Sequence, residues 1–175
     1  MSEPGTRGVE EPPLYCTGCG SLTEERSVEE RMRPVCIACG KVAYLDPKLA
    51  VALLLTRGDR ILLGKRGPGT REPGKWSFPA GFVERGEPVE RAAVREAREE
   101  TGLDVTIGEL IGLYSSEGDP VVLAVYAATC AAGRPVAGDD LTEVGWFTTS
   151  MLPELAFPRD RRIMNEWLVA HPISD

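Results

Sequence analysis

The chain has 175 residues, of which 42% are apolar and 27% are charged, and its formal net charge is −7 at pH 7. This composition is that of a globular protein with one main core, and no apolar run approaches the ~20 residues of a membrane span. The negative charge argues against nonspecific binding to nucleic acid or to anionic membranes, but it permits a phosphorylated ligand that a divalent cation bridges to the protein. The single histidine, His171, lies close to the C-terminus, so any catalytic base is expected to be a carboxylate.

The first part of the chain differs in composition from the rest. Residues 1–13 are polar and rich in Pro, Gly and Glu, which predicts a disordered tail without the apolar core of a signal peptide. We therefore expect a cytoplasmic location. Residues 14–46 are poor in large apolar side chains, and apolar runs begin only after them. This change predicts a domain boundary near residues 46 and 47, with a second domain over 47–175.

The small first domain contains two Cys-x-x-Cys pairs, "CTGCG" and "CIACG", separated by sixteen residues. Four thiolates at this spacing are typical of a structural zinc site, and each following glycine lets the backbone turn its amides toward sulfur. Two disulfides or a redox pair are the alternatives, but the segment is too short for a thioredoxin-type unit. The predicted zinc ligands are Cys16, Cys19, Cys36 and Cys39. The fifth cysteine, Cys130, closes an apolar strand and is interpreted as a buried free thiol.

The second domain alternates predicted strands and helices. A loop rich in Gly and Pro, residues 67–75, follows the first two strands, and the segment 158–170 has apolar residues at helical spacing. Two helices that flank a mixed sheet make an α/β sandwich. The predicted strands cover residues 49–56, 60–66, 76–80, 105–115, 120–130 and 143–148.

A further helix is predicted within "PAGFVERGEPVERAAVREAREETGL". Pro88 suits the first turn of a helix and Gly102 suits the position that ends one. Glu96, Glu99 and Glu100 are spaced i, i+3, i+4 and therefore share one face, where like charges repel by a few tenths of a kcal/mol per pair. A hard divalent cation removes this penalty and favours oxygen ligands. The alternative is a solvated face neutralised by the arginines of the same helix.

The 23 residues from Gly81 to Leu103 match the Nudix box at every defined position, with Ala97 as the smallest residue that fits its apolar slot. The chain therefore resembles the Nudix hydrolase family over roughly residues 47–170. This resemblance implies an α/β/α sandwich that hydrolyses a nucleoside diphosphate linked to another moiety. Such enzymes are Mg²⁺- or Mn²⁺-dependent and commonly form homodimers.

The resemblance also implies roles for particular residues. Glu96, Glu99 and Glu100 would be Mg²⁺ ligands together with the carbonyl of Ala80, so we expect these carboxylates to have no side-chain partners. Arg95 and Glu87 would form an orienting pair. The general base stays open. Its candidates outside the box are Glu117, Asp119, Asp139, Asp140 and Glu143, with a turn or surface role as the alternative for each.

A zinc ribbon before the box resembles the subgroup that contains ADP-ribose and FAD pyrophosphatases. The NADH pyrophosphatases resemble the chain less well, because "IGLYSSEGDPVVLAVY" lacks their Ser-Gln-Pro-Trp-Pro-Phe-Pro array. We therefore expect FAD or ADP-ribose as a small-molecule substrate and AMP as a product, without a nucleic-acid or membrane partner. The alternatives are an NADH or NAD-cap pyrophosphatase, which needs an RNA path, and a nucleotide sensor without activity, which the complete set of box glutamates disfavours.

Side chains near the loop 67–75 are candidates for substrate contacts. Arg66 and Arg71 flank this loop and are placed to meet phosphate, with a solvated role as the alternative. Aromatic rings that are placed to stack on a base or flavin belong to Trp76, Phe78, Tyr114 and Phe157, with core packing as the alternative for each.

Overall fold

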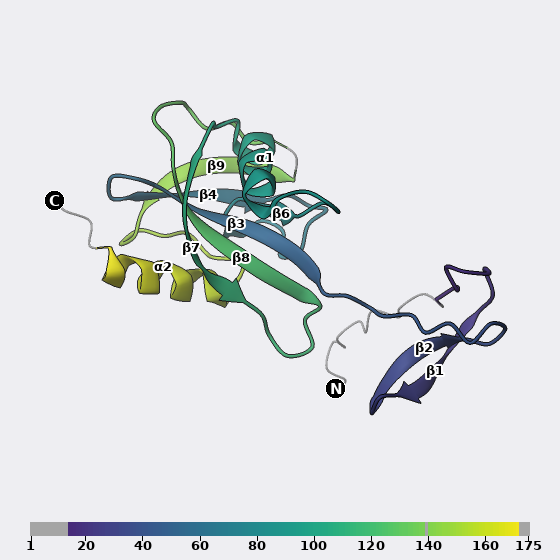
Figure 1. The fold of residues 1–175 in the computed structure, drawn as a ribbon. Coiled ribbons are helices and arrows are strands. Elements are labelled where there is room, and N and C mark those ends of the chain that lie inside the picture. The colour runs from purple at the N-terminus through teal and green to yellow at the C-terminus, as the bar shows by residue number, and fades with distance from the viewer. Residues whose placement is uncertain (1–13, 139, 172–175) are drawn as a thin grey trace, which may run out of the picture. The chain divides into compact units, whose positions relative to one another are not determined.

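The computed structural model describes residues 14–138 and 140–171. The predicted tail, 1–13, lies outside these residues, and so does Asp139. The chain divides into two compact units between Asp46 and Pro47, and each unit is described by itself (Figure 1). In the described part of the chain, neither helix has the length and apolar character needed to cross a bilayer.

The first unit is a small hairpin with two cysteine turns. Strands β1 (Thr23–Val28) and β2 (Arg31–Cys36) pair antiparallel around a tight turn. Gly20 and Gly40 each follow a cysteine pair and adopt φ of 72° and 73°, a conformation that glycine reaches without strain. The buried apolar residues of the unit are only Cys16, Val35 and Cys36 among those described. So small a core needs an additional cross-link to stay folded.

The second unit is built on a mixed sheet in the order β5-β4-β3-β8-β7, in which β6 also pairs with β3 and β9 with β4. The pairing of β3 with β8 is parallel, and the other pairings are antiparallel. The predicted strand "WSFPA" is divided into two short strands, and the other predicted strands agree with the structure to within about two residues. The strands are β3 (Lys48–Arg57), β4 (Arg60–Arg66), β5 (Trp76–Ser77), β6 (Ala80–Phe82), β7 (Thr106–Tyr114), β8 (Val121–Thr129) and β9 (Leu141–Thr148).

The central strand β3 divides the core into two layers, because its side chains alternate between the two faces of the sheet. Val51, Leu53 and Leu55 pack on the face that carries α1 (Val89–Thr101). Ala50, Ala52 and Leu54 pack with Ile163 and Met164 of α2 (Pro158–Ala170). The two helices therefore cover opposite faces of the sheet (Figure 1). This arrangement confirms the predicted α/β/α sandwich, which is preceded by a small four-cysteine unit of zinc-ribbon type.

Helix α1 lies close to the sheet because its contact face consists of alanines. Ala92, Ala93 and Ala97 are fully buried against β3. Pro88 is the N-cap residue with extended ψ of 138°, one position earlier than predicted. Gly102 ends the helix in the left-handed conformation, φ 67°, and its N–H donates to the carbonyl of Arg98 at 2.9 Å.

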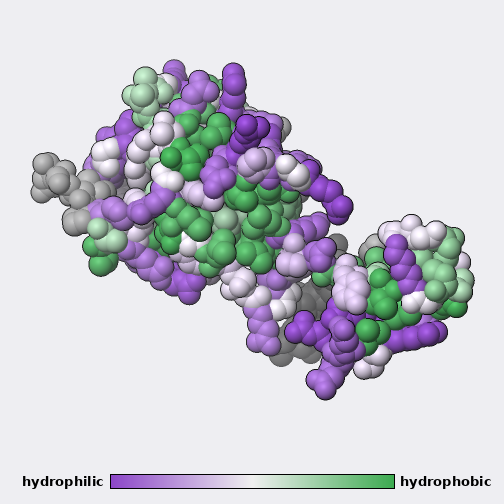
Figure 2. Space-filling view, viewed as in Figure 1, coloured by the Kyte–Doolittle hydropathy of each residue, from purple (hydrophilic) through white to green (hydrophobic). Residues whose placement is uncertain are grey.

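Apolar residues also reach the surface of the second unit. Figure 2 shows them in the middle of the face turned to the viewer, where Figure 1 places β7 and β8, with polar residues around them. Leu110 and Leu113 of β7 are 46% and 63% exposed. Cys130 follows β8 as a buried free thiol, as predicted, and accepts a hydrogen bond from Arg57 at 3.0 Å.

Candidate functional site

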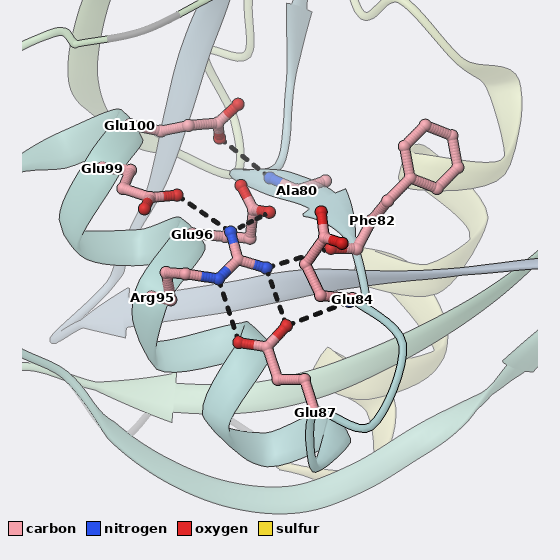
Figure 3. A network of polar contacts seen from close by, with 8 residues as sticks. All are labelled: Ala80, Phe82, Glu84, Glu87, Arg95, Glu96, Glu99 and Glu100. Carbon is pink, nitrogen blue, oxygen red and sulfur yellow. Dashed lines mark hydrogen bonds and ion pairs between the residues drawn. The ribbon is translucent and has the colours of Figure 1, made fainter.

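The box residues form one cluster at the junction between β6, the following loop and α1 (Figure 3). Three of its side chains come from the face of α1 that meets this loop. Glu96 and Glu100 are only 9% and 6% exposed, whereas Glu99 faces solvent. Two carboxylates that are buried one helical turn apart are costly unless positive charge or hydrogen bonds compensate them.

Gly81 is required by the position of Glu96. A Cβ atom at residue 81 would lie 2.0 Å from Cδ of Glu96 and 2.1 Å from its Oε1 atom. Real Cβ atoms do not approach other atoms so closely, so only glycine lets the carboxylate lie against the backbone of β6. The φ angle of Gly81 is not in the left-handed region, so its backbone conformation does not require glycine. Glycine is needed here because a side chain would occupy the space of the Glu96 carboxylate.

Arg95 holds the loop against the helix. Its Nε and Nη2 atoms donate to the two carboxylate oxygens of Glu87, each at 3.0 Å, and Nη2 also donates to the carbonyl of Phe82 at 3.0 Å (Figure 3). These hydrogen bonds lower the pKa of Glu87 and raise that of Arg95 above its usual range. The backbone N–H of Glu84 completes the arrangement by donating to Glu87 at 3.0 Å.

The expectation that the box carboxylates lack side-chain partners is wrong for two of them. Nη1 of Arg95 donates to Glu96 Oε1 at 2.7 Å and to Glu99 Oε2 at 2.9 Å. The reason is geometric, because Arg95 lies one residue from Glu96 and one turn before Glu99 and is thus within reach of both. The three box carboxylates do not converge on one point. In the described part of the chain, the four cysteines are the only group of three or more possible metal ligands whose ligand atoms all lie within 4.8 Å of one another.

Glu100 has the most unusual environment of the cluster. Its Oε2 atom accepts a hydrogen bond from the backbone N–H of Ala80 at 2.9 Å. Burial, the largest cause, raises the pKa of Glu100 to about 8, and the charge of Glu96 acts in the same direction. A divalent cation with oxygen ligands fits this donor set, since it would compensate the buried negative charge. Ala80, whose carbonyl is the fourth predicted oxygen ligand, is thus tied to Glu100 through its own N–H.

The end of α1 is fixed by a segment that the sequence analysis missed. The backbone N–H groups of Val136 and Gly138 donate to the carbonyls of Thr101 and Glu100 at 2.9 and 3.0 Å. A Cβ atom at residue 138 would lie 2.3 Å from the carbonyl oxygen of Glu99. The glycine in "VAGDDL" was the available sign of this close approach. The contact holds the last turn of α1, and with it the two glutamates at its end.

The predicted substrate contacts fall into different environments. Phe78 is 2% exposed within the core that α2 covers, which favours the core-packing alternative for its ring. Its ring packs in the same core cluster as Ile163 and Met164 of α2. Trp76 is half-buried and lies edge-on to Phe147 at 4.8 Å between ring centroids. Tyr114 packs against the same core cluster, and the Cζ atom of Arg162 lies 5.7 Å from its ring centroid.

The two arginines that flank the loop 67–75 are close to each other. Nε of Arg66 donates to the carbonyl of Arg71, and Nη1 of Arg66 donates to Ser77 Oγ at 3.4 Å. Burial lowers the pKa of Arg66, while Glu100 is the largest opposing charge. Arg66 is therefore within electrostatic reach of the box, whereas Arg71 extends into solvent and pairs with Asp119 at 3.7 Å.

The candidate bases outside the box have structural partners in several cases. Asp119 accepts a hydrogen bond from the N–H of Val121 at 3.0 Å, and Glu143 pairs with Lys65 at 2.7 Å. Asp140 is close enough to raise the pKa of Glu100. Asp139 lies outside the described residues. None of these contacts identifies a base.

Two hollows lie near the box. The larger, of about 570 Å³, follows the outer face of α1 and includes Arg95 and Glu99 but neither of the two buried glutamates. It is therefore beside the carboxylate cluster and not centred on it. The smaller, of about 170 Å³, lies between residues 67–70 and 140–142. This hollow lies next to Arg66, because its lining begins at the following residue, Gly67.

The four predicted zinc ligands meet in the first unit. The Sγ–Sγ distances are 3.6 Å for Cys16 and Cys39, 3.5 Å for Cys19 and Cys36, and 3.7 Å for Cys19 and Cys39. A tetrahedral Zn–S₄ centre with bonds of 2.3 Å requires sulfurs roughly 3.8 Å apart, so the donor set fits zinc. The N–H of Gly18 donates to Cys16 Sγ at 3.3 Å and lowers the pKa of that thiol.

Known proteins resemble the chain over most of its length. The NUDIX domain family matches residues 46–168. An ADP-ribose pyrophosphatase from Methanocaldococcus jannaschii is 41% identical over 124 residues, which cover 69% of this chain and 73% of that protein. An NAD-capped RNA hydrolase NudC from Pseudomonas aeruginosa is 35% identical over 146 residues, which cover 83% of this chain and 51% of that protein. The chain thus aligns with only about half the length of this NudC relative.

Solved structures show the same fold. A NUDIX hydrolase from Nitrosomonas europaea superposes with a TM-score of 0.82 and 28% sequence identity, covering 90% of this chain and 93% of that one. A MutT NUDIX hydrolase from Burkholderia pseudomallei gives a TM-score of 0.60 with 30% identity over 69% of this chain and 98% of that one. The box geometry, the family match and these relatives agree, and the chain belongs to the Nudix family of pyrophosphohydrolases.

Proposed function

We propose that the protein hydrolyses a nucleoside diphosphate linked to another moiety, with Mg²⁺ or Mn²⁺ as the cofactor. The observation that carries this proposal is the burial of Glu96 and Glu100 against β6, where Gly81 leaves room for one carboxylate and the Ala80 N–H holds the other. A cluster of this kind is a poor way to stabilise a fold but a suitable way to hold a divalent cation.

In this proposal Glu96, Glu99, Glu100 and the carbonyl of Ala80 hold the cation. A divalent cation supplies charge neutralisation for the diphosphate and acidifies the attacking water. The chain supplies the fixed geometry. Burial of two glutamates keeps bulk water from the charged centre, and the N–H of Ala80 orients the Glu100 carboxylate by a 2.9 Å hydrogen bond.

Arg95 and Glu87 act as the orienting pair. Their two parallel hydrogen bonds fix the guanidinium plane, and the same guanidinium sets the positions of Glu96 and Glu99. Arg95 also compensates part of the negative charge at the helix surface. Because it contacts two proposed cation ligands, its own position determines how far those carboxylates are able to turn.

ADP-ribose is the first candidate substrate, with FAD next and AMP as the product. The M. jannaschii relative named ADP-ribose pyrophosphatase supports this choice, because 73% of the length of that protein aligns with this chain. The zinc-ribbon resemblance supports both substrates.

NADH or an NAD-capped RNA is the second candidate. The relatives named NAD-capped RNA hydrolase NudC favour it, since they match over 83% of this chain. The net charge of −7 is unfavourable for a long RNA path, so the expectation that no nucleic acid binds stays a prediction.

We also propose that Cys16, Cys19, Cys36 and Cys39 hold one structural zinc ion and that the protein is a homodimer. The sulfur spacing supports the zinc site. All four positions would be filled by protein, so this metal would have no open site for substrate. Light scattering of the purified protein at micromolar concentration tests the dimer.

The substrate proposal is tested by incubating the full chain with Mg²⁺ and, separately, ADP-ribose, FAD, NADH and a short NAD-capped RNA. We expect ADP-ribose to yield AMP with the highest kcat/KM of the four substrates. Cleavage should be lost when Mg²⁺ is omitted. Preferred cleavage of the capped RNA would support the second candidate. No cleavage of any of the four at high enzyme concentration would show that the catalytic proposal is wrong.

A further inference from the structure

Three guanidinium groups surround one phenylalanine at the start of α2. The Cζ atoms of Arg159, Arg66 and Arg71 lie 4.8, 5.2 and 5.9 Å from the ring centroid of Phe157. The arginines come from α2, the end of β4 and the loop 67–75. The sequence analysis identified two of the arginines and the ring as separate candidates, but only the fold shows that they form one group.

The positive charge of this group is balanced mainly by acidic groups without close ion pairs. Glu100, Asp140 and Asp160 are the negative charges that act on Arg66. Arg159 has its closest acidic contact at 3.9 Å, with Asp160, and its buried Nε atom has no hydrogen-bond acceptor among the described residues. Arg71 has a side chain that is 72% exposed and an ion pair of 3.7 Å with Asp119. Exposed contacts of this length contribute little and are readily exchanged for a better anion.

A guanidinium that stacks on a ring keeps the N–H donors that the protein does not use available, because they lie in the guanidinium plane and point away from the ring face. Arg66 uses Nε and Nη1 for the Arg71 carbonyl and Ser77 Oγ, so Nη2 is the donor that it offers to a ligand. Arginine edges are well suited to phosphate, which accepts two parallel hydrogen bonds from one guanidinium. The ring therefore organises a set of donors that an oxyanion would satisfy.

The arginine group is adjacent to the box. Ser77 Oγ accepts a hydrogen bond from Arg66 Nη1, and three residues further along the same chain segment the N–H of Ala80 donates to Glu100. Three residues of extended chain span at most about 10 Å. Glu100 is also the largest attractive charge acting on Arg66. A diphosphate held at the box is thus within reach of the arginines.

We propose that Arg66, Arg71 and Arg159, arranged around Phe157, form a phosphate-binding subsite for the diphosphate of the substrate. This inference rests on the proposed function, and it divides the work between the two clusters. The glutamates of α1 hold the cation, and the arginines bind phosphate oxygens directly. The subsite selects for anionic charge and does not depend on which group is linked to the diphosphate.

The test uses the full, zinc-loaded protein and inorganic pyrophosphate as the probe, in buffer freed of divalent cations by a chelating resin. Titration calorimetry measures pyrophosphate affinity without turnover. We expect Arg159→Gln and Arg71→Gln each to weaken binding by about tenfold, as expected for the loss of a charge-assisted contact. Arg161→Gln is the matched control, because this exposed arginine lies on the same helix and belongs to neither cluster.

A second measurement separates binding from packing. We expect the KM for ADP-ribose to rise by about tenfold in Arg159→Gln, with kcat changed less than about threefold, because the lost contact is made in both the ground and transition states. Phe157→Leu should weaken pyrophosphate binding severalfold, and Phe157→Tyr, which keeps a ring face, should restore it. Melting temperatures identify any variant that fails to fold.

The outcomes distinguish this inference from the proposed function. If pyrophosphate binding is lost in the arginine variants but no substrate is cleaved, the subsite stands and the proposed reaction is wrong. If ADP-ribose is cleaved and the folded arginine variants match the wild-type KM and pyrophosphate affinity, the reaction stands and the subsite is wrong.

Discussion

The carboxylate of Glu96 lies directly against the α-carbon of Gly81, at a separation that no side chain at position 81 would permit. A Cβ atom there would be 2.0 Å from Cδ of Glu96. The glycine at the start of the box and the first glutamate of its helix are therefore one structural unit. The absence of a side chain at residue 81 lets α1 approach β6 at this pair of residues.

Replacement of Gly81 by alanine should damage activity more than stability. The displaced group is the far end of a glutamate side chain, so we expect the free energy of unfolding to change by less than about 1 kcal/mol. The displaced carboxylate is a proposed cation ligand, and a shift of about 1 Å in such a group lowers turnover on the order of 100-fold. Gly69→Ala is the control, because a Cβ atom there meets nothing within 4 Å. Steady-state kinetics with ADP-ribose and chemical denaturation measure both quantities.

Replacement of Arg95 by lysine tests the orienting pair. A lysine retains the charge but is unable to make parallel hydrogen bonds to Glu87 while also reaching Glu96 and Glu99. We expect kcat/KM to fall by at least about tenfold and unfolding to become easier by roughly 1–3 kcal/mol, since several charge-assisted hydrogen bonds are lost. Arg91→Lys, an exposed position on the same helix, should have little effect. Equal kinetics of the two variants would contradict the assigned role.

The cysteine unit should bind about one zinc ion per chain, and the ion should be necessary for the fold of this unit. In Cys39→Ser we expect zinc content to fall and amide hydrogen exchange over residues 14–46 to become rapid. The second unit has its own large core and should keep its exchange protection. Cys130→Ser should retain zinc, because Cys130 is far from the cluster in sequence and donates no ligand atom to it. A folded, zinc-free cysteine unit would overturn the assignment.

Asp160 should make stability depend on pH. It is 2% exposed, and burial raises its pKa from 3.8 to about 7. Because the folded pKa is the higher one, the folded state binds more protons, so the stabilising contribution is complete below pH ~4 and is lost as pH rises through ~7.

Asp160→Asn keeps the shape of the neutral acid but has no carboxyl to ionise, so its stability should not fall as the pH rises through ~7. We expect the variant to gain stability relative to wild type between pH 5 and pH 8.5, by a few kcal/mol at most. Chemical denaturation at both pH values measures the difference. A variant whose stability differs from wild type by the same amount at pH 5 and pH 8.5 would argue against a buried, neutral carboxyl.

The sequence predicted the structure best where all the residues of a motif lie within one helix or strand. The spacing of Glu96, Glu99 and Glu100 places them on one helix face whatever surrounds the helix, and Gly102 ends that helix as expected. The β3 strand was equally clear, since an apolar run of this length is buried on both faces. Four cysteines at zinc-ribbon spacing also meet as predicted.

The sequence was least informative about contacts between distant segments. The choice between core packing and a ligand contact stayed open for Phe78, because "WSFPA" is too short to show which face its side chains take. The contact of Gly138 with the end of α1 joins segments almost forty residues apart and has no periodic signal. The grouping of arginines around Phe157 likewise depends on three separate elements. Arg95 shows that even within one helix, the choice among several partners is set by three-dimensional geometry.

The most direct test of the central claim is Glu100→Gln, measured by Mg²⁺-dependent turnover of ADP-ribose and by Mg²⁺ titration calorimetry on the same protein. Glutamine preserves the shape of the side chain and its acceptor for the Ala80 N–H, so the melting temperature should not fall. Glu90→Gln, on the same helix but outside the proposed cation ligands, is the control. We expect kcat to fall on the order of 1,000-fold and Mg²⁺ affinity to fall at least about tenfold. A folded Glu100→Gln protein with wild-type turnover and wild-type Mg²⁺ affinity would contradict the account.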